Sequence, residues 1–361
     1  MSKEPSRRCG PAFPGKAGIN SSLVTLLWAS ATLGVMACGS DDAVTAPPIA
    51  VDQAAAAAAM AAYTAVDLGG PGGASTAFAI NPAGQIVGQN QGPPSFQSHA
   101  ALWVNGVPRD LGTLGGPSSS ATAINTVGQV VGLSSLGPGA RRHAFLWIHG
   151  VMRDLGTLGG VYSAAAGINR NGQVVGASLT KAGLTRAFLW ENGVMRSLGT
   201  LGGNYSAAAA INQAGQIVGS STTAGGRTHA FLWANGHMRD LGTLGGTTSS
   251  AAAINQWGQV VGSSTTADGQ THAFLWENGV RKKLGALTDA FGINPAGQVV
   301  GSILTAKQER HGAVWINGVV TDLGTLGGDF SQVGGINPIG DIVGASVTTA
   351  GEFHATLWKR Q

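Results

Sequence analysis

Residues 206–246 decide the fold, and they read SAAAAINQAGQIVGSSTTAGGRTHAFLWANGHMRDLGTLGG. Four short segments typical of extended strands alternate here with turn signals. Asn212-x-x-Gly215 separates the first segment from the second, and Asn235-Gly236 separates the third from the fourth. Asn-Gly is the strongest short-range hairpin signal, because both central residues of a type I′ turn need positive φ. No segment has room for a helix or shows a 3.6-residue period, so we predict four antiparallel strands.

This unit recurs seven times along the chain. Ile-Asn recurs with Asn at positions 81, 125, 169, 212, 255, 294 and 337, and an apolar run ending in Trp recurs at 103, 147, 190, 233, 276, 315 and 358. Successive copies are 43 or 44 residues apart, with one interval of 39. Tandem units of this length with four strands are typical of propeller blades. Residues 63–361 are therefore predicted to form an all-β, seven-bladed β-propeller of four-stranded antiparallel blades. A solenoid is the alternative, but its units are shorter and it needs polar capping repeats.

The two ends of the array complement each other. The chain finishes with residues 354–361, a third strand that no fourth strand follows, whereas residues 63–67 resemble a fourth strand that lacks the first three. We expect strands from both termini to join in the seventh blade, which would leave no free sheet edge.

Residues 1–37 are typical of a lipoprotein-type signal peptide. A basic segment precedes an apolar run that begins at Leu23, and residues 35–38 read VMAC. Small residues before a single Cys resemble the lipobox of bacterial lipoproteins, in which the Cys receives a diacylglyceryl group and becomes the N-terminus. Cys38 is therefore the predicted lipidation site. An ordinary signal peptide of a secreted protein and an uncleaved anchor are alternatives, although an apolar run of about 15 residues is short for a bilayer span.

Residues 38–62 form a polar, then Ala-rich stretch, which we interpret as a tether between the membrane and the propeller. Gly39 and Ser40 carry no acid of the kind that retains lipoproteins in an inner membrane, so we expect the outer membrane or cell surface. Cys9 lies in the leader, which leaves Cys38 as the only cysteine of the mature chain. The folded domain is therefore expected to have no disulfide and no cysteine metal site.

The charge of the chain argues against a nucleic-acid partner. Only 11% of residues are charged, and the formal net charge is +4. Four of the 21 basic residues and one of the 17 acidic residues precede Cys38, which leaves 17 against 16 in the mature chain. No basic field of the kind that binds nucleic acid remains.

The repeat resembles a bacterial extracellular repeat family named after its His-Ala-Phe (HAF) signature. His-Ala-Phe stands at residues 143–145, 229–231 and 272–274, flanked by Asp-Leu-Gly-Thr-Leu-Gly-Gly and Ile-Asn-x-x-Gly-Gln-Val-Val-Gly in several copies. The other copies depart from the signature, for example with Arg186-Ala-Phe in the third. The resemblance covers residues 63–361 and implies an exported protein, without implying a chemical activity.

The recurrent polar residues suggest no catalytic or metal site. His recurs at 99, 143, 229, 272, 311 and 354, but one His per blade would lie on a wide ring, whereas a metal needs three or four ligands within about 2.0–2.3 Å. We interpret these His residues, and the recurrent Asp, as structural hydrogen-bonding groups. No phosphate loop, nucleophile elbow or zinc spacing occurs, so we expect no cofactor and no catalytic residue. A carbohydrate-active hydrolase or lyase remains the alternative, and it would need two acids such as Glu191, Glu277, Asp289, Asp329 or Glu352 about 5–9.5 Å apart.

Sequence variety is concentrated on one side of the predicted propeller. The turns after the first and third strands are fixed, whereas the loops after the second and fourth strands differ between copies. Loops on a rigid scaffold are the usual place for binding, although they could also be free-drifting solvated loops. We expect a monomeric, non-enzymatic binding scaffold for an unknown protein or glycan. Its candidate binding residues are Phe96, Arg141, Arg142, Lys181, Arg227, Asp268, Lys307, Arg310 and Phe353.

Overall fold

A computed structural model describes residues 63–69, 73–92, 97–137 and 141–361, all of which lie in one compact unit spanning residues 45–361. These described residues form strands and turns without any helix, and so they include no helix that could cross a membrane. The predicted signal peptide, tether and lipidation site Cys38 lie outside the described residues, as does the candidate loop residue Phe96.

The strands fall into seven repeats that follow the sequence periodicity. Repeat 1 consists of β2 (Ser75–Ile80), β3 (Ile86–Gln91), β4 (Ser98–Val104) and β5 (Val107–Asp110). Repeat 2 consists of β6 (Ser119–Ile124), β7 (Val130–Ser135), β8 (Arg142–Ile148) and β9 (Val151–Asp154). Repeat 3 consists of β10 (Gly159–Ile168), β11 (Val174–Thr180), β12 (Thr185–Glu191) and β13 (Val194–Ser197). Repeat 4 consists of β14 (Gly202–Ile211), β15 (Ile217–Thr223), β16 (Thr228–Ala234) and β17 (His237–Gly242).

The last three repeats follow the same plan. Repeat 5 consists of β18 (Gly245–Ile254), β19 (Val260–Thr266), β20 (Thr271–Glu277) and β21 (Val280–Lys283). Repeat 6 consists of β22 (Asp289–Ile293), β23 (Val299–Leu304), β24 (Arg310–Ile316) and β25 (Val319–Asp322). Repeat 7 contributes β26 (Gly327–Ile336), β27 (Ile342–Thr348) and β28 (Phe353–Arg360), and β1 (Tyr63–Asp67) pairs with β28.

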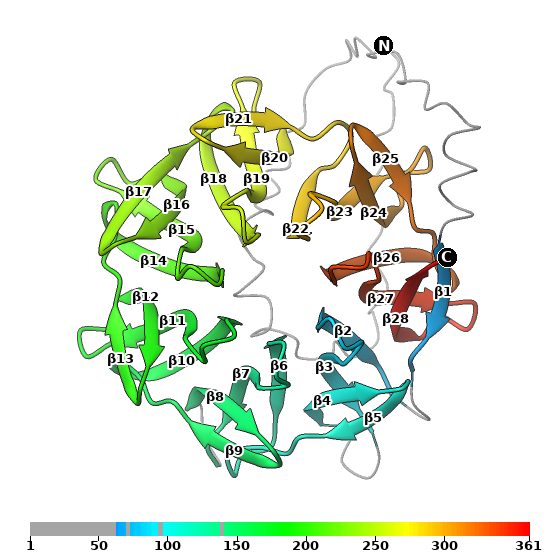
Figure 1. The fold of residues 1–361 in the computed structure, drawn as a ribbon, viewed down its shortest axis with the longest axis horizontal. Coiled ribbons are helices and arrows are strands. Elements are labelled where there is room, and N and C mark those ends of the chain that lie inside the picture. The colour runs from blue at the N-terminus through cyan, green and yellow to red at the C-terminus, as the bar shows by residue number, and fades with distance from the viewer. Residues whose placement is uncertain (1–62, 70–72, 93–96, 138–140) are drawn as a thin grey trace, which may run out of the picture. The chain divides into compact units, whose positions relative to one another are not determined.

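Each repeat forms an antiparallel sheet in which the strand order follows the chain, and β1 completes the order β1-β28-β27-β26. A single parallel pair, Tyr162 with Arg142, links the sheets of repeats 2 and 3. The sheets stand round a common centre, with the first strand of each repeat innermost and the fourth outermost (Figure 1). The predicted all-β fold of four-stranded antiparallel sheets is therefore confirmed.

The turn chemistry follows the sequence signals. The first residue of each strand 3–4 hairpin has positive φ, from 48° at His149 to 53° at Asn235, and the Gly after it does too. This pair of conformations defines the type I′ turn and explains the recurrent Asn-Gly. In the other fixed turn, Asn212 Oδ1 accepts hydrogen bonds from the N–H groups of Ala214 and Gln216, both at 3.0 Å.

These asparagines also join neighbouring sheets. Asn212 Nδ2 donates a hydrogen bond to Asn255 O at 3.2 Å, and the same bond links each repeat to the next from Asn81 to Asn337. Six successive bonds of this kind hold the inner ends of the sheets in register. The Asn therefore recurs because it both shapes its own turn and binds the next repeat.

The core lies between adjacent sheets. One cluster combines Val218, Ala230 and Leu241 of repeat 4 with Phe274 and Trp276 of repeat 5, among others. Five of the seven recurrent Trp residues are buried, whereas Trp190 and Trp233 are half-buried. Outside the core, the Arg109 guanidinium lies 5.6 Å from the Trp147 ring centroid of the next repeat, within cation–π range.

Repeat 6 differs because its sequence lacks four residues. Its first strand, β22, has five residues, whereas β18 and β26 on either side have ten each. The deletion therefore shortens the first strand, whereas residues 284–288 still connect β21 to β22, so the expected shorter connection between repeats is not found. The N–H of Ala273 here bonds Leu287 O, where the other repeats use a serine hydroxyl.

Candidate functional site

The connections between strands lie on two opposite faces. In repeat 4, Ile217 is paired with Trp233 at one end of β15 and β16, and Thr222 is paired with Thr228 at the other end. The fixed Asn-x-x-Gly turns and Asn-Gly hairpins occur at the first end. We call these turns, together with the residues that flank them, the turn face. The loops after the second and fourth strands occur at the other end, which we call the variable-loop face.

The loops after the second strand are more uniform in conformation than their different sequences suggested. In repeat 4, the second and third strands leave only residues 224–227 between them. Thr223 N donates to Arg227 O at 2.8 Å, and Gly226 N donates to Thr223 O at 3.0 Å. The equivalent pair of bonds occurs in repeats 3, 5, 6 and 7, from Thr180, Thr266, Thr305 and Thr348. The loops of these five repeats are therefore hydrogen-bonded turns of one backbone geometry that present different side chains. Loops without a defined conformation would not share the same two hydrogen bonds in five repeats.

Five of the predicted binding residues are exposed on this face: Arg141, Lys181, Arg227, Asp268 and Lys307. The side chains of Arg141, Lys181, Arg227 and Lys307 make no hydrogen bond or ion pair with any other described residue. Asp268 instead accepts hydrogen bonds from Thr266 Oγ1 and Gln270 N, and the Thr266 bond is the main cause of its lowered pKa. The Asp268 carboxylate therefore stabilises its own turn.

The other three predicted residues have partners inside the protein. Arg310 donates hydrogen bonds from Nε and Nη2 to Ser302 Oγ, at 3.1 and 2.9 Å, and lies 3.4 Å from Asp289 Oδ2. Phe353 packs against Phe330 with ring centroids 5.4 Å apart. Arg142 is half-buried beside Tyr162 of the next repeat. The sequence could not separate these packed side chains from the free ones, because their partners come from other strands.

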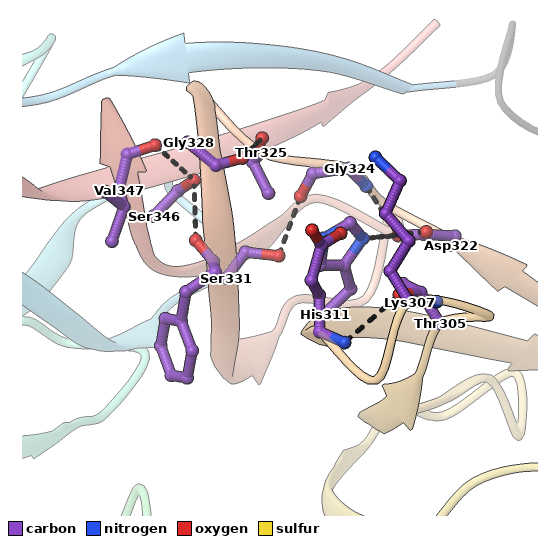
Figure 2. A network of polar contacts seen from close by, with 12 residues as sticks. Thr305, Lys307, His311, Asp322, Gly324, Thr325, Gly328, Ser331, Ser346 and Val347 are labelled. Atoms are coloured by element: carbon purple, nitrogen blue, oxygen red, sulfur yellow. Dashed lines mark hydrogen bonds and ion pairs between the residues drawn. The ribbon is translucent and has the colours of Figure 1, made fainter. Parts of the chain in front are cut away.

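The recurrent His residues form side-chain pairs that sequence reasoning did not assign. His311 Nδ1 lies 2.8 Å from Asp322 Oδ2, and Asp322 Oδ1 accepts a hydrogen bond from Gly324 N at 2.8 Å (Figure 2). Ser331 Oγ of the next repeat donates to Gly324 O at 2.7 Å and accepts from Gly312 N at 3.0 Å. This network joins repeats 6 and 7, so the His has the structural role that the sequence indicated, with an Asp side chain as its partner.

The same His–Asp pair recurs around the molecule. Its distances are 2.7 Å for His99–Asp110, 2.9 Å for His143–Asp154 and 2.8 Å for His229–Asp240. His354 pairs with Asp67 of β1 at 2.9 Å, across the two termini of the described chain. Each pair belongs to a different sheet, and no group of three or more metal-ligating side chains occurs in the described ranges.

Repeats 3 and 5 replace the pair in different ways. In repeat 3, Arg186 Nη1 donates to Thr185 O at 3.0 Å and also to Asn204 O, and Ser197 takes the place of Asp. In repeat 5, Lys283 Nζ lies 2.9 Å from His272 Nε2. Burial, reinforced by the Lys283 charge, lowers the pKa of His272, so the neutral ring accepts the hydrogen bond.

Two tyrosines on the variable-loop face were missed by sequence reasoning. Tyr162 and Tyr205 occupy equivalent positions near the start of the first strands of repeats 3 and 4, and burial raises the pKa of both. The Tyr205 phenolate would raise the pKa of Tyr162 slightly further, so the two side chains are near each other. Their signal was that only these two copies have Tyr at the second position after Gly-Gly.

Four of the five carboxylates considered for a hydrolase each contact a different side chain. Glu191 bonds Arg196 at 2.7 Å, and Glu277 accepts a hydrogen bond from Gln259 at 2.9 Å, both on the turn face. Asp289 faces Arg310, and Glu352 lies 3.4 Å from His354. Each of these four carboxylates has its partner within its own repeat. Asp329 lies in β26.

Comparisons with known proteins agree with this architecture. The β-propeller domain of the Trilobed protease from Pyrococcus furiosus matches with a TM-score of 0.54 and 8% identity, over 80% of this chain and 96% of that domain. The fold is a β-propeller. A puromycin-hydrolyzing peptidase from Mycobacterium tuberculosis matches with a TM-score of 0.54 and 12% identity, over 77% of this chain. TolB from Acinetobacter baumannii matches with a TM-score of 0.48 and 12% identity, over 80% of this chain.

These matches concern the fold alone. This chain spans 52% of the Mycobacterium peptidase chain and 64% of the TolB chain, and identities of 8–12% carry no activity from one protein to another. No protein-family model matches the chain, and no curated protein matches it.

Proposed function

We propose that this chain is an exported, membrane-anchored propeller of the His-Ala-Phe repeat family, with seven blades closed by strands from both termini. It acts as a monomeric, non-enzymatic scaffold that binds a protein or glycan carrying negative charge through its variable-loop face. Lipidation of Cys38 supplies the anchor, at the outer membrane or cell surface.

Several contacts support closure by both termini. β1 pairs with β28 from Tyr63–Arg360 to Asp67–Thr356. Leu68 O accepts a hydrogen bond from Trp103 Nε1 of repeat 1 at 3.0 Å. Ser75 of repeat 1 accepts one from Ala355 N of repeat 7 at 2.9 Å, as the equivalent serines do between other repeats. The N-terminal strand therefore contacts both the last repeat and the first.

The observation that carries the binding proposal is the distribution of free cations. Arg141, Lys181 and Arg227 are exposed on the loops of repeats 2, 3 and 4, and their side chains have no partner among the described residues. Arg142 and Arg186 lie beside them in the strands that follow. We call these five residues the basic patch. Asp154 and Asp240 at the same face of these repeats are paired with His143 and His229. Tyr162, which lies beside Arg142, and Tyr205 add half-buried aromatic surface on the same face, which suits a uronate, a sulfated sugar or an acidic peptide.

The contacts of the candidate carboxylates support a non-enzymatic role. A glycosidase needs a carboxylic acid and a carboxylate facing one substrate bond. Glu191 and Glu277 lie on the turn face, whereas Asp289 and Glu352 belong to the variable-loop side of repeats 6 and 7, and each contacts a different partner. The neutralised or hydrogen-bonded carboxylates are better explained as structural groups.

A glycan array with neutral and acidic sugars, together with an envelope-protein pull-down, tests the proposal. The variant Arg141→Ala/Arg142→Ala/Arg227→Ala should lose at least tenfold in capture of an acidic partner, since two or three charge-assisted contacts disappear. A charge-matched control, Arg153→Ala/Arg170→Ala/Lys359→Ala, removes three cations outside the basic patch and should bind like the parent. Equal capture by the triple variant and the parent would contradict the binding site. Conversion of an array sugar to products would contradict the non-enzymatic role.

A further inference from the structure

The exposed apolar side chains of the described residues gather on the turn face. Thirteen large hydrophobic residues are exposed in the described ranges. Nine of them belong to the fixed turns or flank them: Val104, Val107, Val127, Val151, Val194, Trp257, Val280, Val319 and Ile339. Five of these nine are valines that follow a hairpin Gly, so the repeat itself distributes apolar groups around this face.

Charged residues are nearly absent from the tips of the same turns. Among the fourteen residues between Asn and Gly in the seven Asn-x-x-Gly turns, Arg170 alone is charged. The central pairs of the six hairpins are Asn-Gly or His-Gly. The loops on the opposite face carry Lys181, Arg227 and Lys307 at comparable positions. The tips of the turns on the two faces therefore differ in charge as well as in sequence variety.

Trp257 is the most prominent of these apolar side chains. It is 70% exposed at the tip of the turn that joins β18 and β19. Its indole Nε1 donates a hydrogen bond to Pro295 O of the next repeat at 3.0 Å. Because the polar N–H already has a partner, the ring can enter an apolar phase without the cost of burying an unsatisfied donor. The same bond fixes the orientation of the ring.

The chain enters the propeller at this face. Tyr63, the first described residue, is paired with Arg360, and Arg360 N donates to Asp341 Oδ1 at 3.1 Å. Asp341 follows the Asn337–Gly340 turn, so Tyr63 lies on the turn face. Residue 62 is bonded to Tyr63, and the segment that leads back to Cys38 therefore starts there.

We infer that the turn face rests on the surface of a phospholipid bilayer. The anchor at Cys38 that brings the two together is part of the proposed function. Only 25 residues, 38–62, separate the anchored Cys38 from the propeller, which keeps the turn face at a high effective concentration near the membrane, so even a weak contact is occupied. Trp and aliphatic side chains at turn tips suit the interfacial region of a bilayer. The variable-loop face then points away from the membrane, toward its partner.

Quenching of Trp257 by brominated lipid tests this orientation. The full chain with Cys9→Ser and Trp28→Phe is coupled through the Cys38 thiol to a maleimide phospholipid in phosphatidylcholine vesicles with brominated acyl chains. This coupling fixes the tether geometry whether or not the cell lipidates Cys38. We expect the brominated lipid to quench Trp fluorescence and the additional change Trp257→Phe to abolish that quenching.

Paired charge substitutions supply the matched control. Val127→Asp/Ile339→Asp on the turn face should also abolish the quenching, whereas Leu184→Asp/Leu304→Asp on the variable-loop face should leave it unchanged. Absence of quenching that depends on Trp257, or equal loss with both pairs, would overturn the inference. So would a dimer in solution with Trp257 shielded from acrylamide, since a second copy would then cover the face. None of these results depends on whether the basic patch binds a partner.

Discussion

Ser249 provides the sharpest test of how adjacent sheets are held together. Its hydroxyl accepts a hydrogen bond from Ala230 N at 2.9 Å and donates one to Gly242 O, and the residue is 4% exposed. Ser249→Ala removes the hydrogen-bond partner of Ala230 N, in a buried residue, and of Gly242 O, in a half-buried residue. An unsatisfied buried group costs about 1–3 kcal/mol, so with partial relaxation we expect a loss of about 2–4 kcal/mol in the free energy of unfolding.

Urea unfolding followed by Trp fluorescence measures this loss as a lower midpoint at unchanged slope. Ser250→Ala is the matched control, because Ser250 is the next residue, is half-buried, and its hydroxyl makes no hydrogen bond to any described residue. The control should lie within about 0.5 kcal/mol of the parent. A loss below about 1 kcal/mol for Ser249→Ala, or an equal loss for Ser250→Ala, would refute the role of the serine in joining the sheets.

Three further substitutions test the repeat, the altered His site and the anchor. Gly219→Ala should lower the free energy of unfolding in urea by about 1–3 kcal/mol, because the added Cβ would lie 2.1 Å from Ala207 O. Gly225→Ala, whose Cβ would meet nothing closer than 3.8 Å, should leave the stability unchanged, and equal effects of the two changes would contradict the steric explanation. Lys283→Asp restores the His–Asp pair of repeat 5 and should stabilise the protein by about 0.5 kcal/mol. Because the pKa of His272 is lowered in the folded protein, the contribution of His272 to stability is lost as the pH falls below about 6.5. This loss of stability at low pH should be smaller in Lys283→Asp. The same dependence of unfolding on pH in the variant and the parent would contradict the prediction. Cys38→Ser should abolish recovery of the mature protein with membranes, and continued pelleting would indicate another anchor.

The repeat architecture could be predicted because each signal is local. Asn235-Gly236 requires a particular pair of backbone conformations, and its recurrence at a fixed spacing identifies hairpins without any knowledge of tertiary contacts. The alternation of turns and apolar segments then fixes four strands per repeat.

Part of the site was visible in the sequence but not recognised. His and Asp recur eleven residues apart, as in His229 and Asp240, and the hairpin between them brings the two positions together. The common geometry of the variable loops also had a signal, since Thr recurs three residues before Gly, as at Thr223 and Gly226. Both patterns concern one repeat and could be found without a structure.

Contacts between strands that no turn joins directly could not be predicted. The proximity of Tyr162 to Tyr205, the Arg310–Asp289 contact and the bond from Trp257 to Pro295 depend on how neighbouring strands and sheets approach one another. Periodicity alone does not give that spacing. For the same reason the sequence did not separate the free cation Arg227 from the engaged Arg310.

Both proposals depend on the pairing of β1 with β28, which completes the last sheet. This pairing determines how the variable loops are arranged around the centre and at which face the tether leaves the propeller. Thr64 and Lys359 are directly opposite in the β1–β28 pair and both are exposed. In a Cys9→Ser/Cys38→Ser background, Thr64→Cys/Lys359→Cys should form an intramolecular disulfide under mild oxidation, measured by thiol titration and gel mobility. The pair Thr64→Cys/Lys282→Cys, which joins unpaired strands, should stay reduced. Free thiols in the first pair, or disulfide-linked dimers alone, would contradict closure by the two termini.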